Sequence, residues 1–257
     1  MRALVTGASS GIGRDMARYL NSLGYELIIT ARCEEKLQEL KNELNTKNDN
    51  VIDIIVADLS KEEECKRLYR QVKEKYERID LLVNNAGFGL LGEFENTDLT
   101  KELAMIDTNI KAVHILTKLF LKDMIQNDSG RILNVASIAG FMPGPLMATY
   151  YATKNYIVRL SQAIREELRK EKSKVSISVL CPGPVNTNFN KVADVKFNLK
   201  SLSSEEVAKY GIDKALSGKF IIIPGTTVKI ARVLSKISPD TLVAKVCYHM
   251  QEKKRKQ

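Results

Sequence analysis

The sequence has no tryptophan, only two histidines and four cysteines in 257 residues. The cysteines are far apart and include no C-x-x-C pair, which argues against a disulfide framework and a cysteine zinc site. They are Cys33, Cys65, Cys181 and Cys247. The two histidines, His114 and His249, provide little material for a histidine-based hydrolase or a metal centre. We therefore expect no metal site and a reducing, cytoplasmic location.

Long apolar runs are also missing, since no uninterrupted stretch approaches the roughly 18 residues that span a bilayer. Met1 leads directly into a strand pattern and a glycine loop, so we expect no signal peptide. The net charge is +9, but +4 of it lies in the last thirteen residues, and no aromatic residues alternate with a basic stripe. We expect no nucleic-acid binding from this pattern.

The pattern that is present alternates strands and helices. Short runs rich in Val, Ile and Leu predict strands buried on both faces, at residues 2–6, 26–31, 51–56, 79–84, 131–136, 175–181 and 219–223. Helical patterns separate these runs, so the sheet should be parallel. We expect an α/β three-layer Rossmann fold with a doubly wound, seven-stranded parallel sheet, in a single domain over residues 1–257.

The first strand pattern runs into a glycine-rich loop. Gly7, Gly11 and Gly13 have the spacing Gly-x-x-x-Gly-x-Gly, and a helical pattern begins at Arg14. Glycines allow a tight turn and close approach to a ligand, and free N–H groups at a helix start attract a phosphate. The loop therefore predicts a dinucleotide site. Its candidate cofactor-binding residues are Gly7, Ser9, Ser10, Gly11, Ile12 and Gly13.

The end of the second strand indicates which dinucleotide binds. An NAD site places a carboxylate there, about 20 residues past the glycines, on the ribose 2′-hydroxyl. This sequence has Arg32 instead. Because a guanidinium binds a 2′-phosphate and a carboxylate repels it, Arg32 predicts NADP(H) over NAD. Arg14 is a second candidate cation for the same phosphate.

A second group of residues has the composition of a proton-transfer site. Tyr150 and Lys154 lie four residues apart, which puts them on one face of a helix, and Ser137 lies thirteen residues before Tyr150. An ammonium beside a phenol stabilises the phenolate and brings proton exchange toward neutral pH. Tyr151 lies three residues before Lys154, so spacing alone does not decide between the two tyrosines.

Together these motifs resemble the short-chain dehydrogenase/reductase family in its compact single-domain branch, and they are most similar to a bacterial group of NADP-dependent oxidoreductases. The resemblance covers about residues 1–190. The motifs that carry it are Thr6-Gly7-x-x-x-Gly11-x-Gly13, Asp58-Leu59, Asn84-Asn85-Ala86-Gly87, Asn109, Ser137, Tyr150-x-x-x-Lys154 and Pro182-Gly183-x-Val185-x-Thr187. One departure is Ala112, where the family often has glycine.

The resemblance implies cofactor contacts along the carboxyl edge of the sheet. Asp58 would hydrogen-bond the adenine, with Leu59 nearby. Asn85 would pack beside the adenine ribose, or would serve only to fix a neighbouring loop. The other positions that the resemblance places against the cofactor are Ala86, Gly87, Tyr150, Lys154, Pro182, Gly183, Val185 and Thr187, of which Thr187 would contact the nicotinamide carboxamide.

The resemblance also implies catalytic roles, and its pattern selects Tyr150 over Tyr151. Ser137 would hydrogen-bond the substrate carbonyl while Tyr150 protonates its oxygen. Lys154 would bind the nicotinamide ribose and lower the tyrosine pKa, and Asn109 would hold a water that connects Lys154 to solvent. The implied reaction is reversible hydride transfer between NADP(H) and a small-molecule carbonyl compound or secondary alcohol, and the implied assembly is a homodimer.

Beyond the shared motifs, residues 194–202 are polar and mixed, as expected for a cover over the substrate, and Ser203 should cap a helix. Residues 226–257 predict a helical C-terminal extension of two amphipathic helices on either side of Pro239. We favour packing of their apolar faces against the domain or a twin subunit. The weaker alternative is a peripheral membrane contact through the basic tail.

Two other functions are compatible with a glycine loop of this kind. A non-catalytic, dinucleotide-sensing regulator on the same fold would more naturally have lost Tyr150 or Lys154. An epimerase or dehydratase of the longer nucleotide-sugar branch is disfavoured by the glycine spacing and by the absence of a large C-terminal substrate domain. The substrate has no readable motif, so ketones, aldehydes, hydroxy acids, steroids and sugars all stay open.

Overall fold

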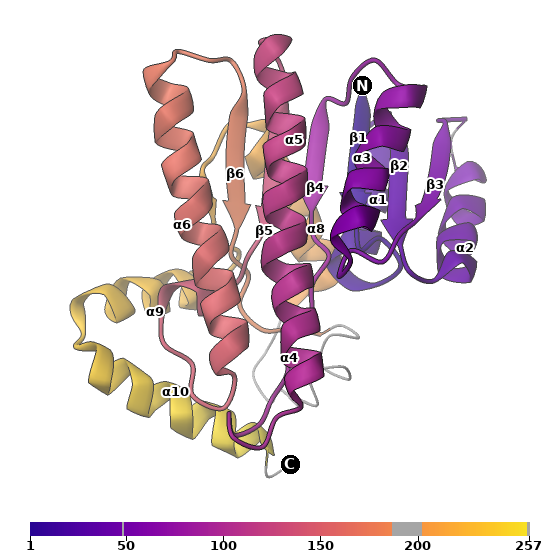
Figure 1. Cartoon of the computed structure of the whole chain (residues 1–257). Helices are drawn as coiled ribbons and strands as arrows, with labels where there is room; N and C mark the ends of the chain where they lie inside the picture. Colours follow the sequence, from indigo (N-terminus) through magenta and orange to yellow (C-terminus); the bar gives the residue numbers. More distant parts are fainter. Residues whose placement is uncertain (48, 187–201, 256–257) are drawn as a thin grey trace.

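The computed structural model describes residues 1–47, 49–186 and 202–255, in which strands and helices alternate along the chain (Figure 1). The strands are β1 (Arg2–Thr6), β2 (Glu26–Ala31), β3 (Ile52–Val56), β4 (Leu81–Asn84), β5 (Arg131–Val135), β6 (Ser176–Leu180), β7 (Val185–Asn186), β8 (Leu202–Ser203) and β9 (Ile221–Ile222). The helices are α1 (Gly11–Ser22), α2 (Glu34–Asn45), α3 (Glu62–Lys75), α4 (Leu99–Ile106), α5 (Val113–Gln126), α6 (Ala148–Lys170), α8 (Ser204–Leu216), α9 (Thr226–Ile237) and α10 (Asp240–Arg255). Two shorter turns of helix complete the set, the π-helical η1 (Asp107–Ala112) and the 3₁₀-helical η2 (Ile138–Phe141).

Seven strands form one parallel sheet in the order β3-β2-β1-β4-β5-β6-β9. β1 lies in the middle, with Ala3 opposite Leu27 of β2 on one side and Leu81 of β4 on the other. The chain winds outward in both directions from this strand. In open α/β sheets a ligand binds at such a reversal, outside the carboxyl ends of the strands.

Helices cover both faces of the sheet, so the fold has three layers (Figure 1). Ala3 and Val5 of β1 pack into a core with α1, α2 and α8, whereas Leu4 points to the opposite face and packs with α3, α5 and α6. This alternation follows from the two-residue period of a strand. It explains why the strands are apolar at nearly every position, as the sequence predicted for strands buried on both sides.

A buried polar network fixes α6 over the sheet. Asn84 Nδ2 of β4 donates to Asn134 Oδ1 of β5 at 2.9 Å and to Thr117 Oγ1 of α5 at 3.0 Å. Asn134 Nδ2 donates in turn to Ser161 Oγ of α6 at 3.0 Å. Leaving one such buried group without its partner costs about 1–3 kcal/mol, so the four elements are held in one arrangement.

The expected α/β fold and its seven-stranded parallel sheet are confirmed, but several strands are shorter than expected. The last strand is reduced to Ile221–Ile222, because it lies at the sheet edge, pairs only with β6, and is followed by Pro224, which has no N–H to donate. The short parallel pair of β7 and β8 was not predicted, since two residues carry no periodic signal. Most of the expected substrate cover, residues 194–201, lies outside the described residues.

The C-terminal part of the chain is helical, as expected. Ser203 caps α8 with a reciprocal hydrogen-bond pair to Glu206, and α9 and α10 lie on either side of Pro239. Within the described residues, no helix is long and apolar enough to cross a bilayer.

Candidate active site

A cavity of about 690 Å³ opens at the carboxyl edge of the sheet and gathers residues from most of the sequence motifs. The predicted site residues that line it are Gly7, Ser9, Ser10, Gly11, Ile12, Arg32, Asp58, Leu59, Asn85, Ala86, Gly87, Ser137, Tyr150, Lys154, Pro182, Gly183 and Val185. Gly13, Arg14 and Asn109 are not among the lining residues, and Thr187 lies outside the described residues. The motifs therefore converge on one cavity at the predicted edge.

The glycine loop is shaped by its contact with Asn85. The Asn85 Nδ2 group donates to Thr6 O at 2.9 Å and to Gly7 O at 3.2 Å. A Cβ atom at Gly13 would lie 2.2 Å from that nitrogen, and Gly7 has a φ of 66°, in the left-handed region. Both glycines are therefore required by the local packing. Of the two roles considered for Asn85, fixing the neighbouring loop is the one its hydrogen bonds perform.

The start of α1 fits a phosphate group. This helix begins at Gly11, and the Ser10 side chain makes no capping hydrogen bond to it. The first N–H groups of a helix have no intrahelical acceptor and carry the positive end of the helix dipole. Since Ser10, Gly11 and Ile12 all line the cavity, this helix end is suited to the pyrophosphate of a dinucleotide.

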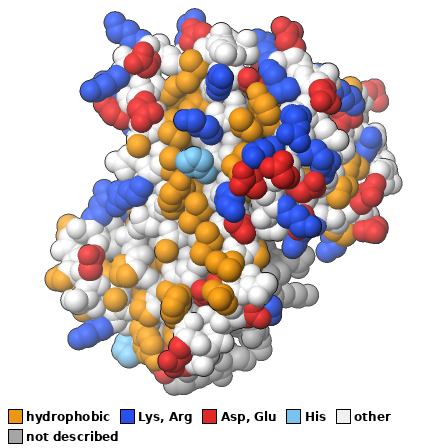
Figure 2. All heavy atoms as spheres, viewed as in Figure 1, with side chains coloured by type: hydrophobic (Ala, Val, Ile, Leu, Met, Phe, Trp, Pro, Cys, Tyr) orange, Lys and Arg blue, Asp and Glu red, His pale blue; other side chains and the backbone are white. Residues whose placement is uncertain are grey.

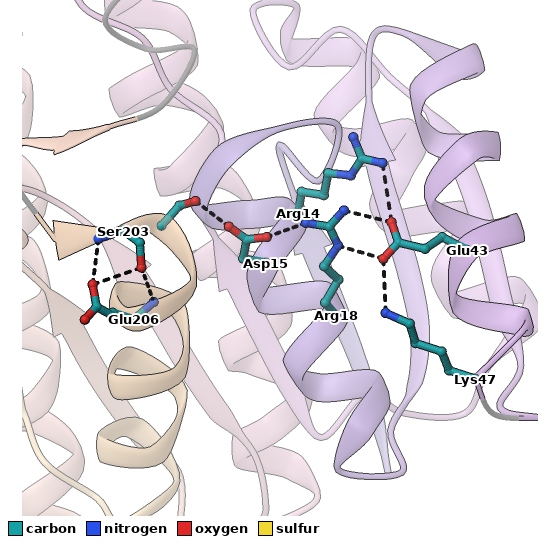
Figure 3. A network of polar contacts seen from close by, with 8 residues as sticks. Arg14, Asp15, Arg18, Glu43, Lys47, Ser203 and Glu206 are labelled. Atoms are coloured by element: carbon teal, nitrogen blue, oxygen red, sulfur yellow. Dashed lines mark hydrogen bonds and ion pairs between the residues drawn. The ribbon is translucent and has the colours of Figure 1, made fainter.

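Two cationic side chains that follow β2 line the cavity, and only one of them was predicted from the sequence. Arg32 and Lys36 both line it and are exposed, and neither has an ion pair within the described residues. Arg14 instead lies against Glu43, with Nη2 3.5 Å from Oε2, in a network that also holds Arg18 (Figure 3). Lys36 is therefore a second cation at the cavity beside Arg32, and a cofactor contact of Arg14 stays a prediction. The sequence signal for Lys36 was its position four residues after Arg32, at the start of the following helix.

The Glu43 network has a structural role. Arg18 donates to both carboxylate oxygens of Glu43, at 2.9 and 2.8 Å, and also to Asp15 at 2.7 Å. The hydrogen bonds from Arg18 are the largest cause that lowers the pKa of Glu43 to about 2. Asp15 further accepts a hydrogen bond from Ser204 at the start of α8. The network thus joins α1, α2 and α8 on one face of the sheet (Figure 3), and none of its residues lines the cavity.

Asp58 stands where the resemblance implies an adenine contact. One of its carboxylate oxygens, Oδ1, accepts hydrogen bonds from Ser60 N at 3.2 Å and from Ser60 Oγ at 2.8 Å. These bonds orient the carboxylate at the end of β3, next to Leu59, with both residues in the cavity lining. The carboxylate is therefore positioned by its own loop.

Tyr150 and Ser137 meet at the other end of the cavity. Tyr150, in the first turn of α6, is 9% exposed and lies close enough to the Ser137 side chain for that hydroxyl to favour its phenolate form. Ser137 Oγ accepts from Ala139 N at 3.2 Å, which orients it at the start of η2. Burial raises the pKa of Tyr150 to about 12, and the Ser137 hydroxyl acts in the opposite direction. At neutral pH the phenol therefore carries its proton.

Lys154 lies one turn further along α6 and is also buried. Its Nζ donates to Val135 O at 3.0 Å and lies 5.8 Å from the centre of the Tyr150 ring. Burial lowers the pKa of Lys154 to about 8. The effect of Lys154 on the pKa of Tyr150 stays a prediction, and that pKa nevertheless lies above its ordinary value. The reason is desolvation of the phenol, which outweighs the interactions that favour the phenolate.

Asn109 positions the site from beneath the cavity. It is 1% exposed in the π-helical turn η1, and its Nδ2 donates to Phe88 O at 2.9 Å and to Thr153 Oγ1 at 3.1 Å. Its Oδ1 accepts from Phe88 N at 3.0 Å. The side chain thus fastens the loop after β4 to α6 beside Lys154. The water that we expected Asn109 to hold stays a prediction.

The structure distinguishes the two tyrosines that spacing left open. Tyr151 OH accepts a hydrogen bond of 2.6 Å from Gln251 Nε2 of α10, whereas Tyr150 lies beside Ser137. Gln251 is 2% exposed and lines the cavity. No sequence pattern predicted this contact, because the two residues are 100 positions apart and Gln251 lies beyond the shared motifs.

The sequence model of the short chain dehydrogenases matches residues 1–196, so this chain belongs to that family. It is 33% identical over 210 residues to an uncharacterized oxidoreductase of Staphylococcus saprophyticus, which covers 82% of this chain and 88% of the relative. The expected resemblance is confirmed, and the chain is an oxidoreductase of this family.

Solved structures with the same fold hold nicotinamide dinucleotides. A short-chain dehydrogenase from Sphingobium yanoikuyae in complex with NADPH has a TM-score of 0.82 and 26% identity, over 92% of this chain and 96% of that one. A short chain dehydrogenase/reductase from Burkholderia phymatum in complex with NAD has a TM-score of 0.83 and 24% identity, over 91% of this chain and 92% of that one.

Replacing Lys154 with Met should change the pH dependence of stability. Burial lowers the pKa of Lys154 from 10.5 to about 8, so between these values the unfolded chain keeps a proton that the folded chain has lost. The free energy of unfolding of the wild type, relative to that of Lys154→Met, therefore rises with pH across this window, by up to about 1.4 kcal/mol per pH unit. Urea unfolding of both cofactor-free proteins checks this. A difference that stays constant with pH would contradict the lowered pKa.

Proposed function

We propose that this protein is an NADP(H)-dependent oxidoreductase that transfers hydride reversibly between nicotinamide and a carbonyl compound or secondary alcohol. The observation that carries the proposal is that buried Tyr150 and Ser137 line the same end of the cavity, with Lys154 on the next turn of the Tyr150 helix. A dinucleotide-sensing regulator would need neither the phenol nor its serine partner. The cytoplasmic location and the homodimer expected from the sequence stay predictions.

The dinucleotide would be held by the glycine loop and the residues that end β2, β3 and β4, and when bound it supplies or accepts the hydride. Ser137 would orient the substrate oxygen by a hydrogen bond. Tyr150, protonated at neutral pH because its pKa is about 12, would donate its proton to that oxygen in the reductive direction. Lys154 would then stabilise the phenolate that remains. In oxidation these proton transfers run in reverse.

The preference for NADP(H) is supported by charge at the end of β2. Arg32 and Lys36 present two cations to the cavity without ion pairs in the described part of the chain, which suits a 2′-phosphate. No acidic residue stands at the Arg32 position, where an NAD site has its carboxylate. Because the related structures hold NADPH in one case and NAD in another, the preference rests on these two side chains.

Tyr150→Phe should lower kcat with a carbonyl substrate by about 10²-fold or more, because it removes the proton donor while keeping the ring. NADPH affinity should change little. Tyr151→Phe is the matched control, since it removes the neighbouring hydroxyl that faces Gln251, and it should keep most of the turnover. Steady-state kinetics and NADPH fluorescence titration provide the two readouts. Equal turnover of Tyr150→Phe and the wild type would rule out the proposed acid.

Arg32→Ala and Lys36→Ala should each weaken NADPH binding by about 10-fold or more, because each removes a charge-assisted contact to the 2′-phosphate. NADH affinity should stay nearly constant in both variants. Arg14→Ala provides the control, since Arg14 is engaged by Glu43, and it should leave the ratio of the two affinities unchanged. Calorimetric titration with each cofactor measures these ratios. If both cofactors lost affinity equally, the 2′-phosphate site would lie elsewhere.

A further inference from the structure

The outer face of α9 is apolar. Four of its side chains recur at three- and four-residue steps and are 53 to 75% exposed: Ile230, Val233, Leu234 and Ile237. None of the residues of α9 is buried. The side that faces the domain carries Val228, which packs against a core cluster, and Arg232, whose guanidinium lies 4.7 Å from the centre of the Phe141 ring. The apolar stripe of this helix therefore points away from the protein.

α10 has an inner and an outer apolar side. Val243, Cys247 and Gln251 are buried at four-residue steps, and the thiol of Cys247 lies 3.5 Å from the sulfur of Met142. On the outer side, three further side chains are 46 to 52% exposed: Leu242, Val246 and Met250. Hydrophobic side chains gather in Figure 2 over the lower left of the molecule, where Figure 1 places these two helices. Packing against the domain therefore accounts for only one side of α10.

Positive charge accompanies this exposed surface. Residues 226–253 contain five lysines and arginines and two acidic residues, so they carry a net charge of +3. Lys236 on α9 and Lys245 on α10 are exposed and form no ion pair within the described ranges. A second copy of this surface would bring two segments of like charge together, which is unfavourable. A partner surface that is both apolar and negatively charged would complement the exposed face of α9 and α10.

We propose that α9 and α10 form a docking surface for a membrane that contains anionic lipids. Exposed apolar side chains beside lysines are the features by which an amphipathic helix lies in the plane of the interface. The lysines would pair with anionic headgroups, and the attraction would be screened by salt. Neither helix crosses the bilayer, in agreement with the absence of a spanning helix among the described residues.

The docking surface adjoins the cavity. Gln251 of α10 lines the same cavity as Tyr150 and Lys154 and hydrogen-bonds Tyr151 beside them. Docking of the outer side of α10 would therefore hold that end of the cavity close to the lipid. The proposal goes beyond the reaction proposed above and does not depend on it, because vesicle binding is measured without cofactor or substrate.

Sedimentation of the full chain with vesicles tests the proposal. The protein should sediment with vesicles of phosphatidylcholine and phosphatidylglycerol in equal parts, should stay in solution with phosphatidylcholine alone, and should be released by added salt. Val233→Asp and Ile237→Asp, each alone, should weaken binding to the mixed vesicles by about tenfold or more, because each places a carboxylate in the inserted stripe.

Val51→Asp is the matched control. Val51 is 50% exposed before β3, on the far side of the sheet from α9, so this variant makes the same chemical change and should bind vesicles like the wild type. Circular dichroism and thermal unfolding verify that each variant is folded. Failure of the wild type to bind mixed vesicles, or equal binding by all variants, would overturn the proposal. The proposal would also be overturned if Val233→Asp dissociated an oligomer in analytical ultracentrifugation while vesicle binding persisted. The apolar stripe of α9 would then be a contact surface for a second copy of the chain.

Discussion

The hydrogen bonds between the end of β1 and the end of β4 are the constraint on which both halves of the cavity depend. Thr6 Oγ1 accepts from Asn85 N at 2.9 Å and from Ala86 N at 3.0 Å, and the Asn85 side chain returns two bonds to the glycine loop. These bonds hold the helix start of α1 next to the loop after β4. That loop is tied through Asn109 to α6, so the phosphate end and the proton-transfer end of the cavity share one support.

The arrangement of the cavity buries two titratable side chains of α6, Tyr150 and Lys154, and their burial costs free energy. Desolvation moves the pKa of Tyr150 up to about 12 and that of Lys154 down to about 8, so each group is shifted toward its neutral form. The Ser137 hydroxyl and the hydrogen bond of Lys154 with Val135 partly offset the loss of water. Such opposed shifts in one cavity are typical of functional sites, where a proton must move between positioned groups.

The fold was predictable because its signals are local and repeated. The apolar runs predicted six of the strands nearly in full. In the structure, residues of the glycine loop, Arg32 and the Tyr150-x-x-x-Lys154 motif all line the cavity. Contacts between distant segments were not predictable from local patterns. Glu43 of the facing helix engages Arg14, while Lys36 lines the cavity, and Gln251 contacts Tyr151 because of the path of the C-terminal helices. The raised pKa of Tyr150 depends on burial, which spacing does not reveal.

The central claim is that the Tyr150–Ser137 pair serves hydride transfer to a carbonyl carbon. Deuterium placed at both hydrogen positions of C4 in the reduced nicotinamide of NADPH follows that transfer directly, when the protein is incubated with a panel of ketones and aldehydes and the products are analysed by mass spectrometry. The account predicts an alcohol product that carries one deuterium on the former carbonyl carbon. If NADPH bound but no product across the panel contained deuterium, the account would be contradicted.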